Sequence, residues 1–158
     1  MIFIRADGNA AIGSGHVMRT LSISDALTEL GQEVVYVLAD EAALSLVQGR
    51  GYRAHVLRTD YARMEDELPR LLRCIGEDKP AGILVDSYAV TKSYLNALRD
   101  ALPVAYMDDL AAFAYPSELL VNYNAYGPEM DYGSLYRREN TKLPMLLLGT
   151  EYAPLRRM

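Results

Sequence analysis

The sequence predicts an α/β domain built around a doubly wound, mainly parallel sheet. Two observations carry this prediction. Short apolar runs alternate with segments of helical periodicity from the first residue to about position 107, which is the pattern of repeated βαβ units. Several runs are almost entirely apolar, as expected for strands that are covered on both faces. Because crossovers between parallel strands are right-handed, such a chain winds helices onto both faces of the sheet.

Seven apolar runs are predicted to be strands, at residues 2–5, 33–40, 52–58, 81–86, 103–109, 118–124 and 144–150. Four segments between them are predicted to be helices, at residues 16–31, 40–51, 63–79 and 91–102. Gly31 suits the left-handed residue that follows a helix. Pro69 is expected to begin or kink the third helix, because proline lacks an amide hydrogen.

Size and composition limit the possible functions. With 158 residues, 51% of them hydrophobic, the chain is expected to form one domain over residues 1–158. A net charge of -5 argues against nucleic acid or an anionic membrane as the main partner. No apolar run approaches the roughly 18 residues of a membrane-spanning helix, and the N-terminus is too polar for a secretory signal. The single cysteine, Cys74, cannot form an internal disulfide, so a cytoplasmic location is expected.

The character of the sequence changes between residues 113 and 136. Glycine and proline interrupt this irregular stretch, and its five tyrosines either cover the sheet or face another domain: Tyr115, Tyr123, Tyr126, Tyr132 and Tyr136. After the last predicted strand the chain ends in a basic segment, residues 151–158.

Polar residues gather where the predicted strands end. They are Asp7 and Asn9, Asp40, Asp86 and Tyr88, Asp108 and Asp109, and Asn122 and Asn124. In open α/β sheets, ligands bind outside the carboxyl ends of the strands, so this edge is expected to carry the site. The alternative for any one of these residues is a helix cap or a turn. For Asp7, a further alternative is an ion pair with Arg5.

The stretch "IGSGHVMR", residues 12–19, lies where the first strand passes into the first helix. Free backbone N–H groups at a helix start attract anions, and Gly13, Ser14 and Gly15 would let one approach closely. Met18 stands where a dinucleotide fingerprint has its third glycine, and Asp40 would have to be the ribose-binding acid. Binding of NAD is therefore weakly supported, and a phosphate loop ending in Gly-Lys-Ser/Thr is absent.

His16 falls in the first turn of the predicted helix if Gly13 or Ser14 caps it. The positive end of the helix dipole disfavours the imidazolium form, so a neutral ring is favoured near pH 7. A neutral imidazole can accept a proton, which suits a general base. A hydrogen bond to a neighbouring loop is the alternative. His55 lies inside a predicted strand and has no expected role.

Taken together, these motifs resemble a known family. The segments "IRADGNAAIGSGHVMRTLSISDAL", "LVDSY", "YMDDLA", "LLVNYNAY" and "LLLGTEYAPLR" resemble the N-terminal half of the UDP-sugar hydrolases of the pseudaminic acid pathway. That family also contains proteins of spore coat polysaccharide biosynthesis. The resemblance covers essentially the whole chain. More distantly, the chain is similar to two-domain GT-B glycosyltransferases.

The resemblance implies a fold and a reaction. The fold would be the Rossmann-like N-terminal half of a GT-B-like protein. The substrate would be UDP-2,4-diacetamido-2,4,6-trideoxy-β-L-altropyranose, hydrolysed to UDP and the free sugar without metal or other cofactor. His16 matches the catalytic histidine of the family and would remove a proton from the attacking water. The proposed substrate contacts are Gly13, Ser14, Gly15, Arg19, Asp86, Tyr88, Asp109, Asn122 and Asn124.

The resemblance also implies a partner domain. In the family the nucleotide is held mainly by a C-terminal domain, so this chain is expected to carry half an active site. An apolar or tyrosine-lined patch is expected where that domain would dock, and it could drive formation of a homo-oligomer. Alternative functions are the acceptor domain of a glycosyltransferase, a non-catalytic sugar-binding module and, less well supported, a dehydrogenase.

Overall fold

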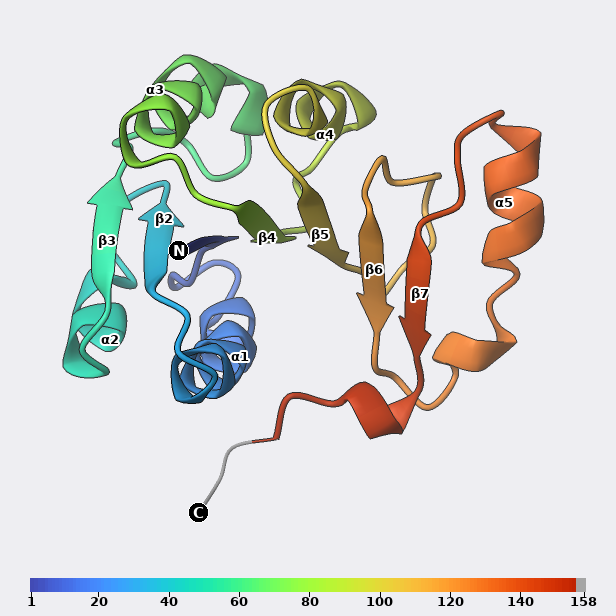
Figure 1. The fold of residues 1–158 in the computed structure, drawn as a ribbon, viewed down its shortest axis with the longest axis horizontal. Coiled ribbons are helices and arrows are strands. Elements are labelled where there is room, and N and C mark those ends of the chain that lie inside the picture. Colours follow the sequence, from blue (N-terminus) through green and yellow to red (C-terminus); the bar gives the residue numbers. More distant parts are fainter. Residues whose placement is uncertain (156–158) are drawn as a thin grey trace.

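The computed structural model describes residues 1–155, which form one seven-stranded parallel sheet flanked by helices (Figure 1). The order of the strands is β3-β2-β1-β4-β5-β6-β7, and every neighbouring pair is parallel. The predicted fold class and all seven predicted strands are confirmed; the first strand is one residue longer than predicted and the other six are shorter. They are β1 (Ile2–Ala6), β2 (Val34–Leu38), β3 (Arg53–Val56), β4 (Gly82–Asp86), β5 (Val104–Met107), β6 (Leu119–Asn122) and β7 (Met145–Leu148). The end of the basic segment, residues 156–158, lies outside the described residues.

The four predicted helices are present, and each is shorter than its predicted range. They are α1 (Gly15–Glu29), α2 (Leu44–Gly49), α3 (Leu68–Asp78) and α4 (Lys92–Arg99). Gly31 follows α1 with φ +78°, and Pro69 lies in the first turn of α3, where its missing N–H costs no hydrogen bond. The 3₁₀ helix η1 (Met64–Glu67) replaces the start of the predicted third helix.

A fifth helix, α5 (Tyr132–Arg138), was not predicted from the sequence. Its seven residues are too few for a clear helical period, and they include Gly133, a poor helix former. The usable signal is Asp131, whose side chain accepts a hydrogen bond from the Ser134 N–H and so caps the helix. Two short 3₁₀ helices flank this region, η2 (Gly127–Glu129) and η3 (Thr150–Tyr152).

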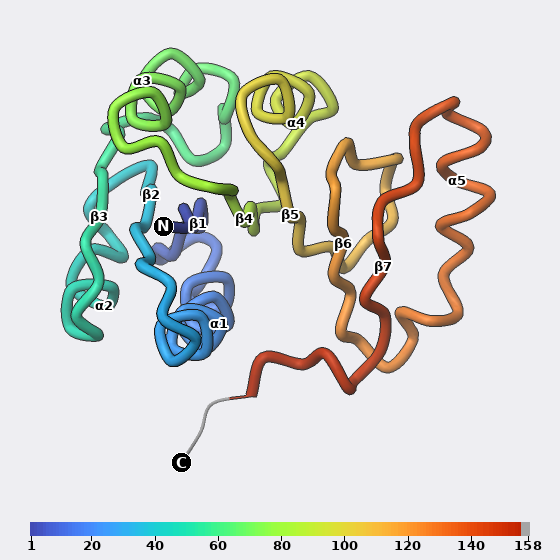
Figure 2. Tube along the Cα trace, viewed as in Figure 1, coloured from blue at the N-terminus to red at the C-terminus, as the bar shows by residue number. Residues whose placement is uncertain are grey.

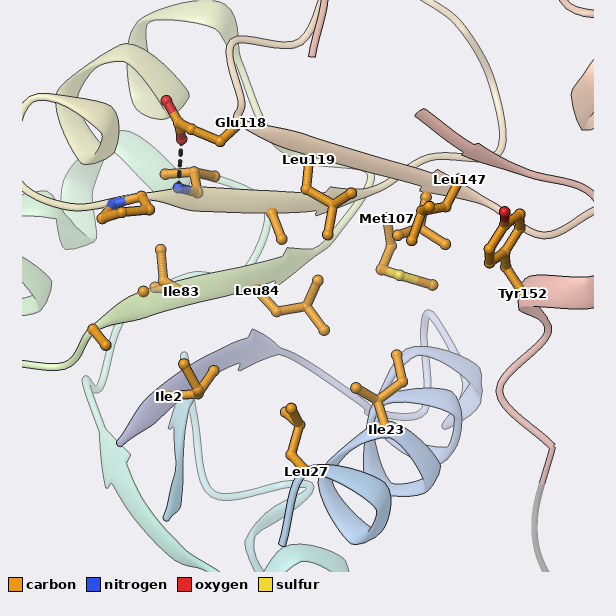
Figure 3. A pocket seen from close by; sticks show the side chains of 16 residues that line it. Ile2, Ile23, Leu27, Ile83, Leu84, Met107, Glu118, Leu119, Leu147 and Tyr152 are labelled. Atoms are coloured by element: carbon orange, nitrogen blue, oxygen red, sulfur yellow. Dashed lines mark hydrogen bonds between the residues drawn. The ribbon is translucent and has the colours of Figure 1, made fainter. Parts of the chain in front are cut away.

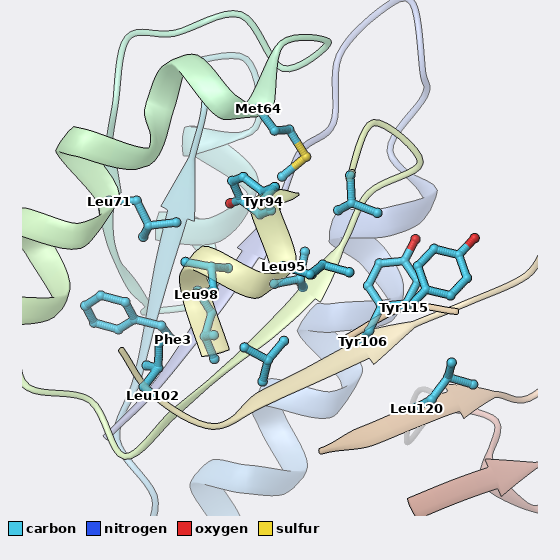
Figure 4. Close-up of a cluster of buried hydrophobic side chains, with 14 of the residues drawn as sticks. Phe3, Met64, Leu71, Tyr94, Leu95, Leu98, Leu102, Tyr106, Tyr115 and Leu120 are labelled. Atoms are coloured by element: carbon cyan, nitrogen blue, oxygen red, sulfur yellow. The ribbon is translucent and has the colours of Figure 1, made fainter. Parts of the chain in front are cut away.

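The sheet has a hydrophobic core on each face. Figure 2 shows α3 and α4 on one side of the sheet and α1 and α2 on the other. Because side chains alternate along a strand, Phe3 enters the core under α3 and α4, whereas its neighbour Ile4 enters the core under α1. In Figure 4, Leu71 of α3 and Leu95 of α4 pack within the first of these cores.

Three of the five tyrosines in the irregular stretch cover the sheet. Tyr115, Tyr132 and Tyr136 are buried in the core on the α3 and α4 side, together with Leu135 of α5. The Tyr136 hydroxyl donates to the Tyr115 carbonyl at 2.7 Å, which satisfies its polar end within the core. Most of the tyrosines between residues 113 and 136 therefore cover the sheet.

The opposite face of the sheet carries an apolar groove of about 540 Å³ beside α1 (Figure 3). Leu84, Met107, Leu119 and Leu147 of four neighbouring strands line it, and Ile23 and Leu27 of α1 and Tyr152 of η3 border it. The groove is mainly aliphatic, with Tyr152 as the tyrosine in its wall. Within residues 1–155, no helix combines the length and the apolar character that crossing a membrane requires.

Candidate functional site

The polar side chains at the carboxyl edge of the sheet meet where β1 and β4 lie side by side. The chain leaves β1 toward one face of the sheet and leaves β4 toward the other, so the strand order reverses here. In doubly wound folds such a reversal opens a crevice for ligands. The structure brings together His16 and Arg19 of α1, Asp86 at the end of β4, Asp109 after β5, and Asn124 after β6.

His16 and Asp86 form a hydrogen-bonded pair. Ser14 is the N-cap of α1, so His16 is the second residue of the helix, and it is 8% exposed. Its Nδ1 lies 2.6 Å from Asp86 Oδ1. A carboxylate oxygen can only accept, so we assign the proton to Nδ1, which leaves the lone pair on Nε2. Among residues 1–155, Nε2 has no hydrogen-bond partner. The pair therefore presents a proton acceptor.

Arg19 links two carboxylates at the base of the site. Its Nε donates to Asp86 Oδ2 at 2.5 Å and one terminal nitrogen donates to Asp86 Oδ1 at 2.5 Å, while the other terminal nitrogen donates to Asp109 at 3.0 Å and to the Tyr123 hydroxyl at 3.0 Å. Burial opposes the charge, but the bonds to Asp86 outweigh it and raise the pKa of Arg19. Arg19 therefore holds Asp86 and Asp109 in place, and its predicted contact with the substrate stays a prediction.

Asp109, like Asp86, accepts hydrogen bonds from several side chains of the site. It accepts from the Tyr88 hydroxyl at 2.5 Å and from the Asn124 amide at 2.9 Å, besides Arg19. Burial alone would raise the pKa of Asp109, but the Tyr88 hydrogen bond and the Arg19 charge outweigh it and lower that pKa. Burial and the same hydrogen bond raise the pKa of Tyr88 to about 12, so its hydroxyl stays protonated at neutral pH. The Tyr88 ring packs edge-on against the His16 ring, with centroids 4.7 Å apart.

Asn122 and Asp108 support the site from below. Asn122 is fully buried; its amide nitrogen donates to the Tyr132 hydroxyl at 2.9 Å, and its carbonyl accepts from the Asn124 side chain at 2.9 Å. A direct sugar contact, as expected from the sequence, does not fit this burial, and Asn122 instead positions Asn124. Asp108 accepts from the N–H groups of Leu110 and Ala111, both at 2.9 Å, and so holds the turn that presents Asp109.

The glycine-rich loop before α1 is tight at its base and open at its tip. Asn9 and Gly13 exchange two backbone hydrogen bonds, of 2.8 and 3.2 Å. Gly13 has φ +72°, a conformation that favours glycine. A Cβ atom at Gly13 or Gly15 would meet nothing within 4 Å, whereas one at Gly8 would lie 3.2 Å from Val17. Gly8 is thus needed for packing, and the backbone near Gly13 and Gly15 is accessible to a ligand.

A buried ionic cluster lies beside this loop. Arg5 pairs with Asp7 at 2.5 Å, which bears out the alternative of an ion pair, and Arg5 Nε also binds Glu67 at 2.7 Å. Glu67 is fully buried and accepts from the Tyr94 hydroxyl at 2.6 Å. Sequence reasoning missed Glu67, because it belongs to the acidic run "MEDE", which is typical of an exposed turn.

Asp40 and His55 form no hydrogen bond with the site residues in the described part of the chain. Asp40 accepts from the Ala42 N–H at 2.8 Å in a turn, as the capping alternative expects. His55 of β3 bonds to Asp78 of α3 at 2.8 Å. Cys74 is half-buried against the core. Within the described part of the chain, no group of three or more His, Cys, Asp or Glu side chains is arranged to hold a metal ion.

Comparison with known proteins shows the fold. No protein-family model and no curated protein sequence matches the chain. Among solved structures, MurG of Acinetobacter baumannii matches 77% of the chain with a TM-score of 0.60 and 12% identity. The spinosyn rhamnosyltransferase SpnG in complex with thymidine diphosphate matches 94% with a TM-score of 0.55 and 19% identity.

The glycosyltransferase SnogD from Streptomyces nogalater also matches 94% of the chain, with a TM-score of 0.50 and 20% identity. The chain spans less than half the length of these structures, namely 41% of MurG, 45% of SpnG and 42% of SnogD. These similarities identify the domain as Rossmann-like and as matching domains of GT-B glycosyltransferases, with the candidate site at the carboxyl edge of its sheet.

Proposed function

We propose that this chain forms the catalytic wall of a nucleotide-sugar hydrolase in which His16 is the general base. The observation that carries the proposal is the 2.6 Å hydrogen bond between His16 Nδ1 and Asp86, which leaves a lone pair on Nε2. The GT-B-like fold supports a nucleotide sugar as the substrate. The resemblance of the five segments to UDP-sugar hydrolases supports water as the nucleophile, and a UDP-linked 2,4-diacetamido-2,4,6-trideoxyhexose as the substrate.

In the proposed reaction, water attacks the anomeric carbon from the side opposite to the departing UDP. A bond forms between the water oxygen and the anomeric carbon while the bond to the diphosphate oxygen breaks, and its electron pair leaves with UDP. His16 Nε2 takes the proton that the water loses, and the Asp86 carboxylate stabilises the resulting imidazolium. A diphosphate is already a stable anion, so it needs less protonation than the sugar alcohol that a glycosidase releases.

The other site residues bind different parts of the proposed substrate. Tyr88, Asp109 and Asn124 contact the sugar, while the backbone of Gly13, Ser14 and Gly15 faces the anionic part of the substrate. Arg19 holds Asp86 and Asp109 in place. Because Arg19 is committed to these carboxylates, the diphosphate is held mainly by a second domain, as the resemblance implies.

A glycosyltransferase is the second candidate, and the similarity to MurG and SpnG favours it. The same histidine would then deprotonate an acceptor hydroxyl in place of water. The test uses a protein in which this chain is followed by the proposed nucleotide-binding domain, here called the two-domain protein. Incubating it with the UDP-sugar alone separates the two functions. Release of free sugar without any acceptor supports the hydrolase, and turnover that depends on an acceptor supports the transferase.

The general-base role is tested with His16→Gln in the two-domain protein, by measuring the rate of UDP release. Loss of a general base is expected to slow release at least ~10²-fold. His55→Gln is the matched control, because His55 also bonds to an aspartate but lies on β3, away from the site. The control should keep wild-type turnover, and wild-type turnover in His16→Gln would refute the role.

A further inference from the structure

Two tyrosines with exposed rings, Tyr88 and Tyr126, form hydrogen bonds to Asp109. Tyr126 is not among the site residues predicted from the sequence. The Tyr88 hydroxyl donates to the Asp109 carboxylate at 2.5 Å, and the Tyr126 hydroxyl donates to the Asp109 main-chain carbonyl at 3.3 Å. Both rings remain open to solvent, with exposed fractions of 56% for Tyr88 and 46% for Tyr126. Their polar ends are thus anchored on one residue, and about half of each side chain stays exposed, although the Tyr88 ring also packs edge-on against the His16 ring.

The two rings come from different loops. Tyr88 follows β4 and Tyr126 follows β6, and β5 lies between these strands. Among the described residues, no ring contact joins Tyr88 and Tyr126, so neither ring covers the other. Leu110, next to Asp109, is 56% exposed. The rim around the polar base of the site is therefore apolar and partly aromatic.

Asn124 places one free acceptor beside these rings. Its amide nitrogen donates to Asp109 Oδ1 at 2.9 Å and to Asn122 Oδ1 at 2.9 Å. Both partners are acceptors, so the assignment of nitrogen and oxygen in Asn124 is fixed by the network. Both of its N–H groups are used, and its Oδ1 has no hydrogen-bond partner among residues 1–155. This oxygen can accept from an N–H or O–H group of a ligand.

We propose that Tyr126 and Tyr88 form an aromatic clamp for the sugar ring of the substrate, with Asn124 Oδ1 as its acceptor. A pyranose has apolar C–H faces that pack on aromatic rings, and its substituents supply N–H and O–H donors. Because their hydroxyls are bonded, the two rings are held in place before binding, which reduces the entropy lost on association. The clamp rests on the proposed function, since it assumes that a nucleotide sugar occupies this edge.

The test measures binding without requiring turnover. Saturation-transfer NMR on the 158-residue chain with UDP-N-acetylglucosamine reports which ligand protons touch the protein. In the wild type, the sugar-ring protons should receive more saturation than the uracil protons. In Tyr126→Ala this ratio should fall, and the Kd should rise about fivefold, as expected for the loss of one aromatic contact.

Two further variants test whether the effect of Tyr126→Ala comes from the loss of its aromatic ring at this position. Tyr126→Phe keeps the ring and loses the 3.3 Å hydrogen bond, so it should retain the sugar signal. Tyr152→Ala removes a ring of similar exposure, 40%, from η3 and should leave the ratio unchanged. An unchanged ratio in Tyr126→Ala, or equal losses in the Phe and Ala variants, would overturn the clamp alone. If the uracil protons respond to the wild type while the sugar-ring protons do not, the sugar does not occupy this edge, so the proposed function fails and the clamp fails with it.

Discussion

The hydrogen bond between Asp86 and His16 decides which imidazole nitrogen carries the proton. Asp86 is almost completely buried, and Arg19 binds both of its oxygens, so the carboxylate has a fixed orientation. A fixed acceptor at Nδ1 selects the tautomer with a lone pair on Nε2. In the proposed function, the general base thus depends on Asp86, whose two oxygens bind His16 and Arg19.

Asp86→Asn is therefore expected to reduce UDP release by the two-domain protein. An asparagine amide can donate to Nδ1 and so favour the tautomer that protonates Nε2, which removes the acceptor. In Ser-His-Asp enzymes such a change costs about 10⁴ in rate, and we expect ~10²–10⁴ here. Thermal unfolding of the variant serves as the control for folding. Wild-type turnover in a folded Asp86→Asn protein would contradict the role of Asp86.

The lowered pKa of Asp109 predicts a contribution to stability that depends on pH. A carboxylate whose pKa is lower in the folded state stabilises the fold above its unfolded pKa of about 3.9. That contribution is lost as pH falls through the folded-state pKa. In urea unfolding at pH 7, Asp109→Asn should have a lower free energy of unfolding than the wild type, and this difference should narrow below about pH 4.

Tyr88→Phe removes a hydrogen bond that lowers the pKa of Asp109. This variant should lose the Asp109 contribution at a higher pH than the wild type does, because the folded-state pKa moves toward its ordinary value. A stability difference between wild type and Asp109→Asn that stays constant from pH 7 to pH 3 would show that the carboxylate charge is irrelevant.

At the scale of elements, Gly13 and Gly15 between β1 and α1 serve different purposes. Gly13 needs its left-handed φ of +72°, whereas Gly15 begins α1 with an ordinary helical conformation and open space around it. Gly13→Ala should cost about 1–2 kcal/mol of unfolding free energy. Gly15→Ala should stabilise the domain by about 0.4–1 kcal/mol, because it restricts the unfolded chain without strain.

Denaturant unfolding of the two alanine variants measures both effects against the same wild type. The pair is matched, since each adds one methyl group at a site where it meets nothing within 4 Å. Equal effects of the two substitutions would mean that the φ of Gly13 does not constrain the loop.

The elements themselves were largely predictable, because periodicity is a local property of the chain. The seven strands and the first four helices follow from apolar runs and caps that lie within a few residues of one another. The short helix α5 was missed, since Gly133 and a length of seven residues weaken its period. The formation of α5 depends on tertiary packing, which a local sequence pattern does not reveal.

The individual roles of the site residues were harder to predict. Asp108 and Asp109 are neighbours in sequence, yet one holds a turn and the other binds Tyr88, Asn124 and Arg19. Glu67 binds Arg5 across a separation of 62 residues, inside what reads as an exposed acidic run. Such partners depend on which loops meet in space, and a single sequence carries no local signal for that.

At the scale of the whole molecule, the strand order explains why the site forms at this edge. With β1 and β4 adjacent and their helices on opposite faces, the loop that carries His16 and the strand end that carries Asp86 meet. The same topology places α1 and α2 on one half of a face and leaves the apolar groove beside them. One arrangement of strands thus produces a polar site and an apolar surface.

The whole domain is expected to bind UDP weakly when it is alone. Arg19 is occupied by two carboxylates, so the diphosphate would meet mainly the backbone N–H groups at the start of α1. A helix terminus contributes about 0.3–1 kcal/mol to such a contact. Association costs at least about 4 kcal/mol, which such a contact does not offset, so we expect a Kd for UDP weaker than about 1 mM.

Calorimetry of the 158-residue chain with UDP checks this expectation, and an assay for free sugar with UDP-sugar as substrate checks its consequence. Holding nucleophile, anomeric carbon and leaving group in line is worth about 7–11 kcal/mol, so hydrolysis by the chain alone should be unmeasurable. Low-micromolar binding of UDP would place the nucleotide site within this domain. It would then overturn the proposed division between a sugar-binding wall here and a nucleotide-binding domain elsewhere.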